Sequence, residues 1–126
     1  MKYLAIDFGL RHLGLAVNFG TLAEPLGKLD YQTQEEAFKK ILKICQAEKI
    51  EKIVMGVSEG KMAEQTRAFG KQLRAIVNLP LVFQDETLTS QEAQEKLLAS
   101  GASQKKRENP HQVAAALILQ TFLDNQ

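Results

Sequence analysis

The sequence has 126 residues, of which 44% are hydrophobic and 25% charged, and its formal net charge at pH 7 is +1. This length suits a single domain over residues 1–126 with a sizeable core, and the composition excludes a disordered or fibrous chain. The near-neutral total charge excludes a general attraction for polyanions, so any nucleic-acid surface must come from local clustering of basic residues.

Three strands are predicted at the start of the chain. Residues 3–6 form a continuous apolar run typical of a strand buried on both faces. Between residues 13 and 18, large apolar residues alternate with small or polar ones, which predicts a second strand beside the first. Residues 21–31 predict a short third strand, broken at Pro25 and Gly27 and therefore placed at the edge of the sheet.

Helices and strands alternate in the middle of the chain. Residues 33–36, TQEE, form a capping box with Thr33 as the N-cap and Glu36 as its partner, and they predict a helix through Ala47. Cys45, the only cysteine, falls on the apolar face of this helix, so we expect a buried structural thiol and exclude a disulfide within the chain. A buried strand over residues 53–55 that ends at Gly56, a helix over about 62–77 and a strand over 81–84 follow.

Two further helices are predicted near the end of the chain. A second capping box, TSQE at 89–92, opens a short helix that ends at Gly101, and Asn109 and Pro110 begin a last helix through residue 123. The order β-β-β-α-β-α-β-α-α predicts an α/β fold, in which a mixed five-stranded sheet opens with a three-strand meander and is flanked by helices. We find no signal peptide and no apolar run long enough to span a bilayer, so we expect a cytoplasmic protein with no membrane partner.

Acidic residues stand where the first and fifth predicted strands end. Asp7 closes the first strand, and Asp85 and Glu86 follow the fifth. If these strands run in the same direction, Asp7 and Glu86 reach the same rim of the sheet, where ligands of open α/β sheets bind. Two carboxylates on one rim repel, and a divalent cation such as Mg²⁺ or Mn²⁺ holds both ionised. The alternative is that acids at strand ends serve as helix caps, a role that suits Asp85.

Four segments carry a resemblance to a known family. "AIDFGLRHLGLAV", "DETLTSQEAQEKLL", "GASQKKR" and "VAAALILQTFLD" occur in this order and spacing, and together they resemble the YqgF family of RNase H-like nucleases. That family was first regarded as Holliday-junction resolvases and later assigned to maturing the end of precursor 16S ribosomal RNA. The resemblance spans nearly the whole chain. It implies an RNase H-like fold and a metal-dependent hydrolase that cleaves phosphodiester bonds in structured nucleic acid, with precursor 16S rRNA as the expected substrate.

The family's acidic triad transfers to this chain at two positions out of three. Asp7 matches the aspartate of its opening motif, DxGxKRxGxA, and Glu86 matches the glutamate of its DERLT segment. The third acid, at the start of the last helix, is replaced here by His111. Asp124 cannot substitute for it, because thirteen residues of helix from His111 place it about 20 Å away.

His111 therefore has two interpretations. As a third ligand beside Asp7 and Glu86, its imidazole suits divalent transition metals, which favours Mn²⁺ over Mg²⁺ in a site of catalytic and metal-binding residues. As a solvated histidine, it would leave the site impaired. Milder departures from the family are Phe8 in place of proline, His12 where arginine is common and Thr87 in place of arginine.

Basic residues near these positions are candidates for contact with nucleic acid. Lys105, Lys106 and Arg107, here called the basic run, directly precede the last helix, and Arg11 and His12 follow Asp7 in the turn between the first two strands. Beside a metal site such residues suit phosphate contacts, and the alternative is a solvated surface.

Three other functions stay open at this point. The family's history allows a resolvase-like endonuclease acting on branched DNA, and His111 allows a catalytically impaired RNA-binding factor of ribosome assembly. The stretch "DFGLRHLGLAV" also resembles the phosphate loop of actin-like and sugar kinases, which need a second lobe to enclose a nucleotide.

Overall fold

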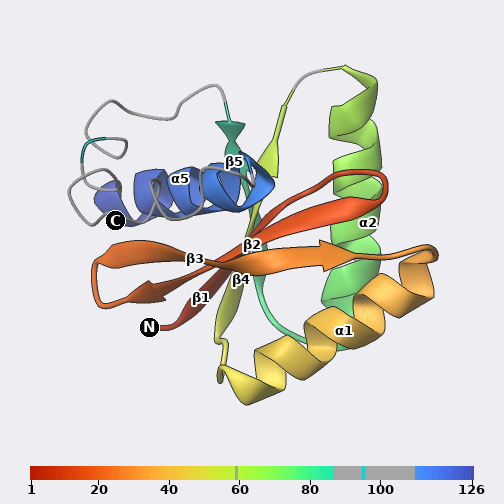
Figure 1. Ribbon diagram of the computed structural model, residues 1–126, viewed down its shortest axis with the longest axis horizontal. Helices are drawn as coiled ribbons and strands as arrows, with labels where there is room; N and C mark the ends of the chain where they lie inside the picture. Colours follow the sequence, from red (N-terminus) through yellow and green to blue (C-terminus); the bar gives the residue numbers. More distant parts are fainter. Residues whose placement is uncertain (59, 87–94, 96–109) are drawn as a thin grey trace.

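A twisted mixed sheet forms the middle layer of the molecule (Figure 1). The computed structural model describes residues 1–58, 60–86, 95 and 110–126, and within these ranges the sheet has five strands in the order β3-β2-β1-β4-β5. Their bounds are Tyr3–Asp7 (β1), His12–Phe19 (β2), Leu22–Asp30 (β3), Lys52–Val57 (β4) and Leu81–Asp85 (β5). β1, β2 and β3 form the predicted antiparallel meander, whereas β1, β4 and β5 run parallel. The predicted mixed five-stranded sheet is confirmed.

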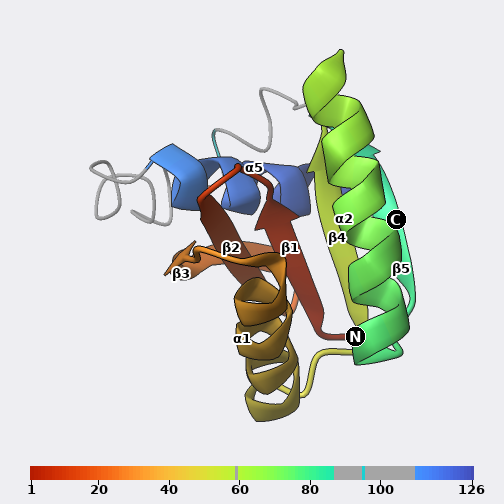
Figure 2. The same ribbon diagram turned by 90° about the vertical axis from the view of Figure 1, so that its right-hand side faces the viewer.

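Helices cover both faces of this sheet (Figures 1 and 2). α1 (Gln34–Ala47) and α2 (Lys61–Val77) lie on one face, and α5 (Pro110–Asp124) lies across the other. The core under α1 and α2 is built from large side chains, among them Phe69, Leu73 and Ile41, all fully buried. The core under α5 is richer in alanine, including Ala115 and Ala116, which lets this helix lie close to the strands.

The start of α1 is capped by one half of the predicted capping box. The Thr33 hydroxyl accepts a hydrogen bond from the Glu36 backbone N–H at 3.2 Å, as expected of an N-cap. The reciprocal bond differs, because the Glu36 carboxylate accepts from the backbone N–H of Gln32 at 2.8 Å and not from that of Thr33. The helix boundary is therefore as predicted, with a modified second contact.

β3 is longer than the sequence indicated. The prediction of an edge strand is confirmed, but the predicted break is wrong, since β3 is continuous over nine residues. Its register with β2 shifts between Leu15 and Ala16, which pair with Gly27 and Pro25, so Leu26 is accommodated as an irregularity. An edge strand tolerates Pro25, because a missing N–H there need not interrupt a ladder on both sides.

Two further expectations concern single features of the chain. Cys45 is buried on α1, and burial raises the pKa of its thiol to about 11, so the prediction of a structural thiol is confirmed. Over the ranges that the structure describes, we find no helix with the length and apolar character needed to cross a membrane. Of the helix predicted over 89–101 only Glu95 is among the described residues, and the N-cap predicted at Asn109 lies outside them.

Candidate active site

The rim where β1, β4 and β5 end collects the acidic residues singled out by sequence. Asp7 is the last residue of β1 and Asp85 the last of β5, with Glu86 directly after it. β1 pairs parallel with β4 and β4 pairs parallel with β5, so the expected common direction of the first and fifth strands is confirmed. β4 separates the two acidic strand ends, and the carboxylates must meet across it.

Glu86 meets Asp7 at this rim. The pKa of Glu86 is raised from 4.5 to about 7, first by burial, then by a side-chain hydrogen bond to Asp7 and by the negative charges of Asp7 and Asp85. A hydrogen bond between two carboxyl groups requires a proton on one of them. Near neutral pH Glu86 is therefore close to half-protonated, and a cation placed there would compete with its proton.

Gly56 makes this meeting of the two acids possible. It lies on β4 between the two acidic strand ends, and a Cβ atom built on it would fall 2.7 Å from Oε1 and 2.9 Å from Cγ of Glu86. The same Cβ would also overlap Cδ1 of Ile118 on α5. The Glu86 side chain thus crosses the sheet over a position that only glycine leaves open. Sequence reasoning missed this role, although a glycine inside a buried strand is itself a signal of close approach.

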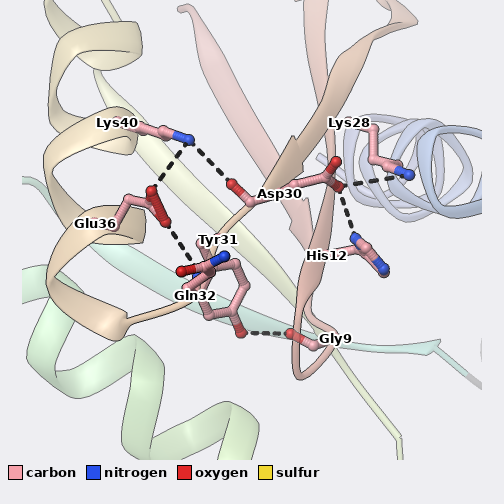
Figure 3. Close-up of polar contacts among 8 residues, drawn as sticks. All are labelled: Gly9, His12, Lys28, Asp30, Tyr31, Gln32, Glu36 and Lys40. Atoms are coloured by element: carbon pink, nitrogen blue, oxygen red, sulfur yellow. Dashed lines mark hydrogen bonds and ion pairs between the residues drawn. The ribbon is translucent and has the colours of Figure 1, made fainter.

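The turn between β1 and β2 is tied to the start of α1 (Figure 3). The Tyr31 hydroxyl donates to the carbonyl of Gly9 at 2.6 Å, and the Tyr31 backbone N–H donates to the carbonyl of Arg11 at 3.0 Å. These bonds fix the backbone that follows Asp7. Arg11 and His12 are both exposed and line a hollow of about 500 Å³ beside this turn.

His12 is engaged by an acidic neighbour on β3. Its Nδ1 lies 2.6 Å from Oδ1 of Asp30, which also lies 3.5 Å from the ammonium of Lys28 (Figure 3). The hydrogen bond from His12 is the largest of several effects that lower the pKa of Asp30, so this carboxylate is ionised at neutral pH. Arg11 is therefore the better placed of the two for a phosphate, since the charge of Asp30 offsets that of a protonated His12.

The remaining predicted residues lie partly or wholly outside the described structure. His111 is in the first turn of α5, but its side chain is outside the described residues, as are Lys105, Lys106 and Arg107. Within the described part of the chain, no group of three or more metal-binding side chains is arranged around one point. The oxygen donors of Asp7 and Glu86 still fit a hard divalent cation. They are adjacent, and a bound cation would relieve their mutual repulsion when both are ionised.

Comparison with known protein families gives one match over nearly the full length. The model of a family described as "RuvX: Holliday junction resolvase" matches residues 1–125. Two of the similar curated proteins both carry the name "Putative pre-16S rRNA nuclease". The protein of Lawsonia intracellularis is 35% identical over 98% of this chain and 94% of its own length. That of Caldanaerobacter subterraneus subsp. tengcongensis is 31% identical over 100% and 98%.

Comparison with solved structures shows the same fold. A RuvC of Thermus thermophilus in complex with a Holliday junction substrate superposes with a TM-score of 0.71, at 18% identity over 96% of this chain and 91% of that one. The fowlpox virus Holliday junction resolvase gives a TM-score of 0.62 at 9% identity over 99% of each chain. At these identities the likeness concerns the fold alone, and it confirms the expected RNase H-like architecture.

Proposed function

This chain belongs to the RuvX family, and from this premise we propose that it acts as a single-domain cytoplasmic nuclease on precursor 16S rRNA. The reaction is the hydrolysis of phosphodiester bonds with divalent metal ions as cofactor. The observation that carries the proposal is the pairing of Asp7 with Glu86 across Gly56, at the rim where parallel strands end.

Asp7 and Glu86 would hold the metal, and His111 would complete the site from the first turn of α5. Divalent ions held there would supply activation of a water and stabilisation of the leaving oxygen. The chain's own residues supply the placement of these donors. Gly56 leaves room for the Glu86 side chain to cross β4, and the hydrogen bond from Tyr31 to Gly9 fixes the turn that follows Asp7.

Contacts to the nucleic-acid backbone would come from Arg11, His12 and the basic run. Arg11 is exposed and follows Asp7 by four residues in the turn between β1 and β2. Its guanidinium suits bidentate contact with a phosphate. These contacts would hold the substrate in register and carry no sequence information themselves.

The test of the proposed function is cleavage of a labelled precursor 16S rRNA fragment in Mg²⁺ or Mn²⁺. Asp7→Asn removes a metal-binding charge and should abolish cleavage, with a loss of at least about a thousandfold, while the protein stays folded. Glu48→Gln, at the opposite end of α1 from the N-cap, is the matched control and should cleave like the parent. Cleavage by Asp7→Asn at the parental rate would remove the proposed site.

His111 is tested by its effect on metal preference. Imidazole is a softer and neutral donor, so we expect higher activity with Mn²⁺ than with Mg²⁺. His111→Asp restores the acid of the family motif and should move the preference back toward Mg²⁺, whereas His111→Ala should be far less active than either. If His111→Ala equals the parent with both metals, the histidine is not a ligand.

A second candidate function is cleavage of branched DNA. It is favoured by the description of the matching family and by the fold shared with RuvC. Including a labelled four-way DNA junction in the same assay separates the two, because efficient junction cleavage without cleavage of the precursor RNA would assign DNA as the substrate. Metal-independent RNA binding without any cleavage would instead indicate an impaired assembly factor.

A further inference from the structure

Asp7 belongs to a row of residues that crosses the sheet from β1 to its outer edge. In the pairing of β1 with β2, Asp7 is opposite Gly14, and in the pairing of β2 with β3, Gly14 is opposite Lys28. Direct partners on neighbouring antiparallel strands point to the same face of the sheet. Asp7, Gly14 and Lys28 therefore share one face, and two strand spacings of about 4.8 Å each separate the two charged residues.

The acidic pair lies on the face that α5 covers. Ala5 packs in the core under α5, so alternation along β1 places Asp7 on the same side. A Cβ atom built on Gly56 would meet both Glu86 and Ile118 of α5, which places the Glu86 side chain on this face as well. A residue that contacts a substrate held by this pair must therefore also point to the α5 side of the sheet.

Lys28 points to this side from the edge strand. Its neighbour Leu29 packs in the opposite core, under α1 and α2, so alternation along β3 turns Lys28 toward the α5 side. The Lys28 ammonium lies 3.5 Å from Oδ1 of Asp30, the last residue of β3 (Figure 3). Asp30 is shared with His12, and the Lys28 side chain is still 36% exposed, so its ammonium can contact a further anion.

Glycines flank Asp7 on both neighbouring strands. On β4, Gly56 follows Met55, the partner of Ile6, and Glu86 reaches Asp7 across it. On β2, Gly14 is the direct partner of Asp7 and has no side chain that could stand between Asp7 and Lys28. The row thus places an acid on one side of Asp7 and a lysine on the other.

We propose that Lys28 contacts a backbone phosphate of the nucleic-acid strand bound at the acidic rim, and that this contact directs the strand across β2 and β3. This inference rests on the proposed function, and it adds the path of the substrate. Two carboxylates repel a polyanion, so a cation on the same face offsets that repulsion where the strand leaves the metal-binding residues. Lysine binds a phosphate as a point charge, so the contact positions the strand without reading its sequence.

The first arm of the test measures binding of a labelled precursor 16S rRNA fragment by fluorescence anisotropy. Asp7→Asn serves as the parent, so that cleavage does not interfere. Lys28→Ala should weaken binding about fivefold to tenfold and flatten the slope of log K against log salt by about one unit. Lys28→Arg keeps the charge and should bind within about twofold of the parent. The control Lys43→Ala removes the same charge from α1, on the other side of the sheet, and should change neither affinity nor slope.

The second arm measures cleavage with Asp7 intact. Lys28→Ala should raise KM about fivefold to tenfold and leave kcat within about twofold, because the contact is made equally in the ground state and the transition state. An exposed ion pair such as Lys28–Asp30 contributes little to stability, so the melting temperature should stay unchanged.

The inference is wrong if Lys28→Ala binds like its parent, if Lys28→Arg does not restore binding, or if Lys43→Ala flattens the slope as much. It is also wrong if kcat falls while KM stays constant. If the protein with Asp7 intact cleaves no RNA but the binding results hold, the proposed function fails and the contact of Lys28 with nucleic acid stands.

Discussion

Glu86 is a carboxyl group whose ionisation is opposed by its position. Burial, the hydrogen bond to Asp7 and the charge of Asp85 all favour its protonated form, which brings its pKa to about 7. Asp7 is predictable as a site residue from its place after an apolar run, and Glu86 from its place after the fifth strand. Their mutual hydrogen bond is not, because it depends on a path across β4 that only the folded sheet defines.

This shifted pKa predicts how the stability of the metal-free protein changes with pH. In the unfolded chain Glu86 titrates near 4.5, and in the folded chain near 7, so the folded state binds the proton more tightly. The stabilisation is fully present below about pH 4.5 and is lost as the pH rises through about 7. With EDTA present, urea denaturation between pH 4.5 and pH 8 should show a loss of about 2 kcal/mol from this group, less than the full shift would give because Glu86 is only half-buried and solvent screens it.

Glu86→Gln isolates this contribution from all other titrating groups. The amide does not titrate, so the variant should not lose this stability. Its free energy of unfolding relative to that of the parent should therefore increase from pH 4.5 to pH 8. Parallel stability profiles for the two proteins would contradict a raised Glu86 pKa.

At the scale of elements, the sequence predicts the positions of helices and strands better than their local irregularities and capping contacts. The apolar runs and the Thr33 cap place β1, β4 and α1 within a residue or two of their observed bounds. β3 was expected to break at Pro25, but tertiary packing against β2 keeps it continuous by a local register shift. At the start of α1, the Glu36 carboxylate accepts from the backbone N–H of Gln32 and not from that of Thr33, a difference of one residue that depends on the backbone path of the preceding loop.

Gly56 is the point where β4, the Glu86 side chain and α5 approach closest. In Gly56→Ala the new Cβ would overlap Ile118 and lie 2.7 Å from the Glu86 carboxylate, so α5 or Glu86 must move. We expect a loss of about 1 to 3 kcal/mol of stability, as for other overpacked sites. If Glu86 holds the metal as proposed, cleavage should fall about tenfold or more, because a small displacement of a metal-binding carboxylate is costly.

Gly27→Ala is the matched control for stability. Its Cβ would meet nothing within 4 Å, and Gly27 lies in a strand, so the substitution should leave stability unchanged or raise it by about 0.4 to 1 kcal/mol. Melting temperatures measured side by side check both expectations. Equal stability of Gly56→Ala and the parent, with full activity, would show that the close packing around Gly56 is not required.

The packing of α1 against the sheet is reported by Cys45. Its thiol is only 5% exposed, and burial raises its pKa from 9.0 to about 11. At pH 8 this leaves roughly a hundredfold less reactive thiolate than an ordinary cysteine would have. Modification by a disulfide reagent should therefore be at least about a hundredfold slower in the native protein than in the urea-unfolded protein. Equal rates would indicate that the face of α1 that carries Cys45 is not packed against the sheet.

At the scale of the whole molecule, the strand pairings bring the acidic rim and Lys28 onto one face of the sheet. The rim lies where β1, β4 and β5 end, and β3 is at the edge farthest from β5 in strand order. The strand pairings explain why sequence reasoning found the acids and missed the lysine. Strand-end acids are visible in the sequence, whereas the place of Lys28 depends on its register with Gly14 and Asp7.

The chain as a whole has little electrostatic attraction for a polyanion, since its formal net charge is +1. An acidic rim repels phosphates, so binding must depend on where positive charge is placed and not on its total. Replacing the three residues of the basic run with alanine takes the formal net charge from +1 to −2. It should weaken RNA binding about equally for every sequence and flatten the slope of log K against log salt by roughly two to three units.

The decisive comparison is with a variant that has the same net charge as the basic-run variant but loses its three positive charges at other positions. Replacing three exposed basic residues of α1 and α2 with alanine also removes three positive charges; these are Lys39, Lys71 and Arg74. Counterion release counts only the cations that contact phosphates, so this control should keep the parental salt slope. If both variants flatten the slope alike, the effect is one of total charge, and the basic run is an ordinary solvated surface. If only the basic-run variant does so, these residues contact the nucleic-acid backbone.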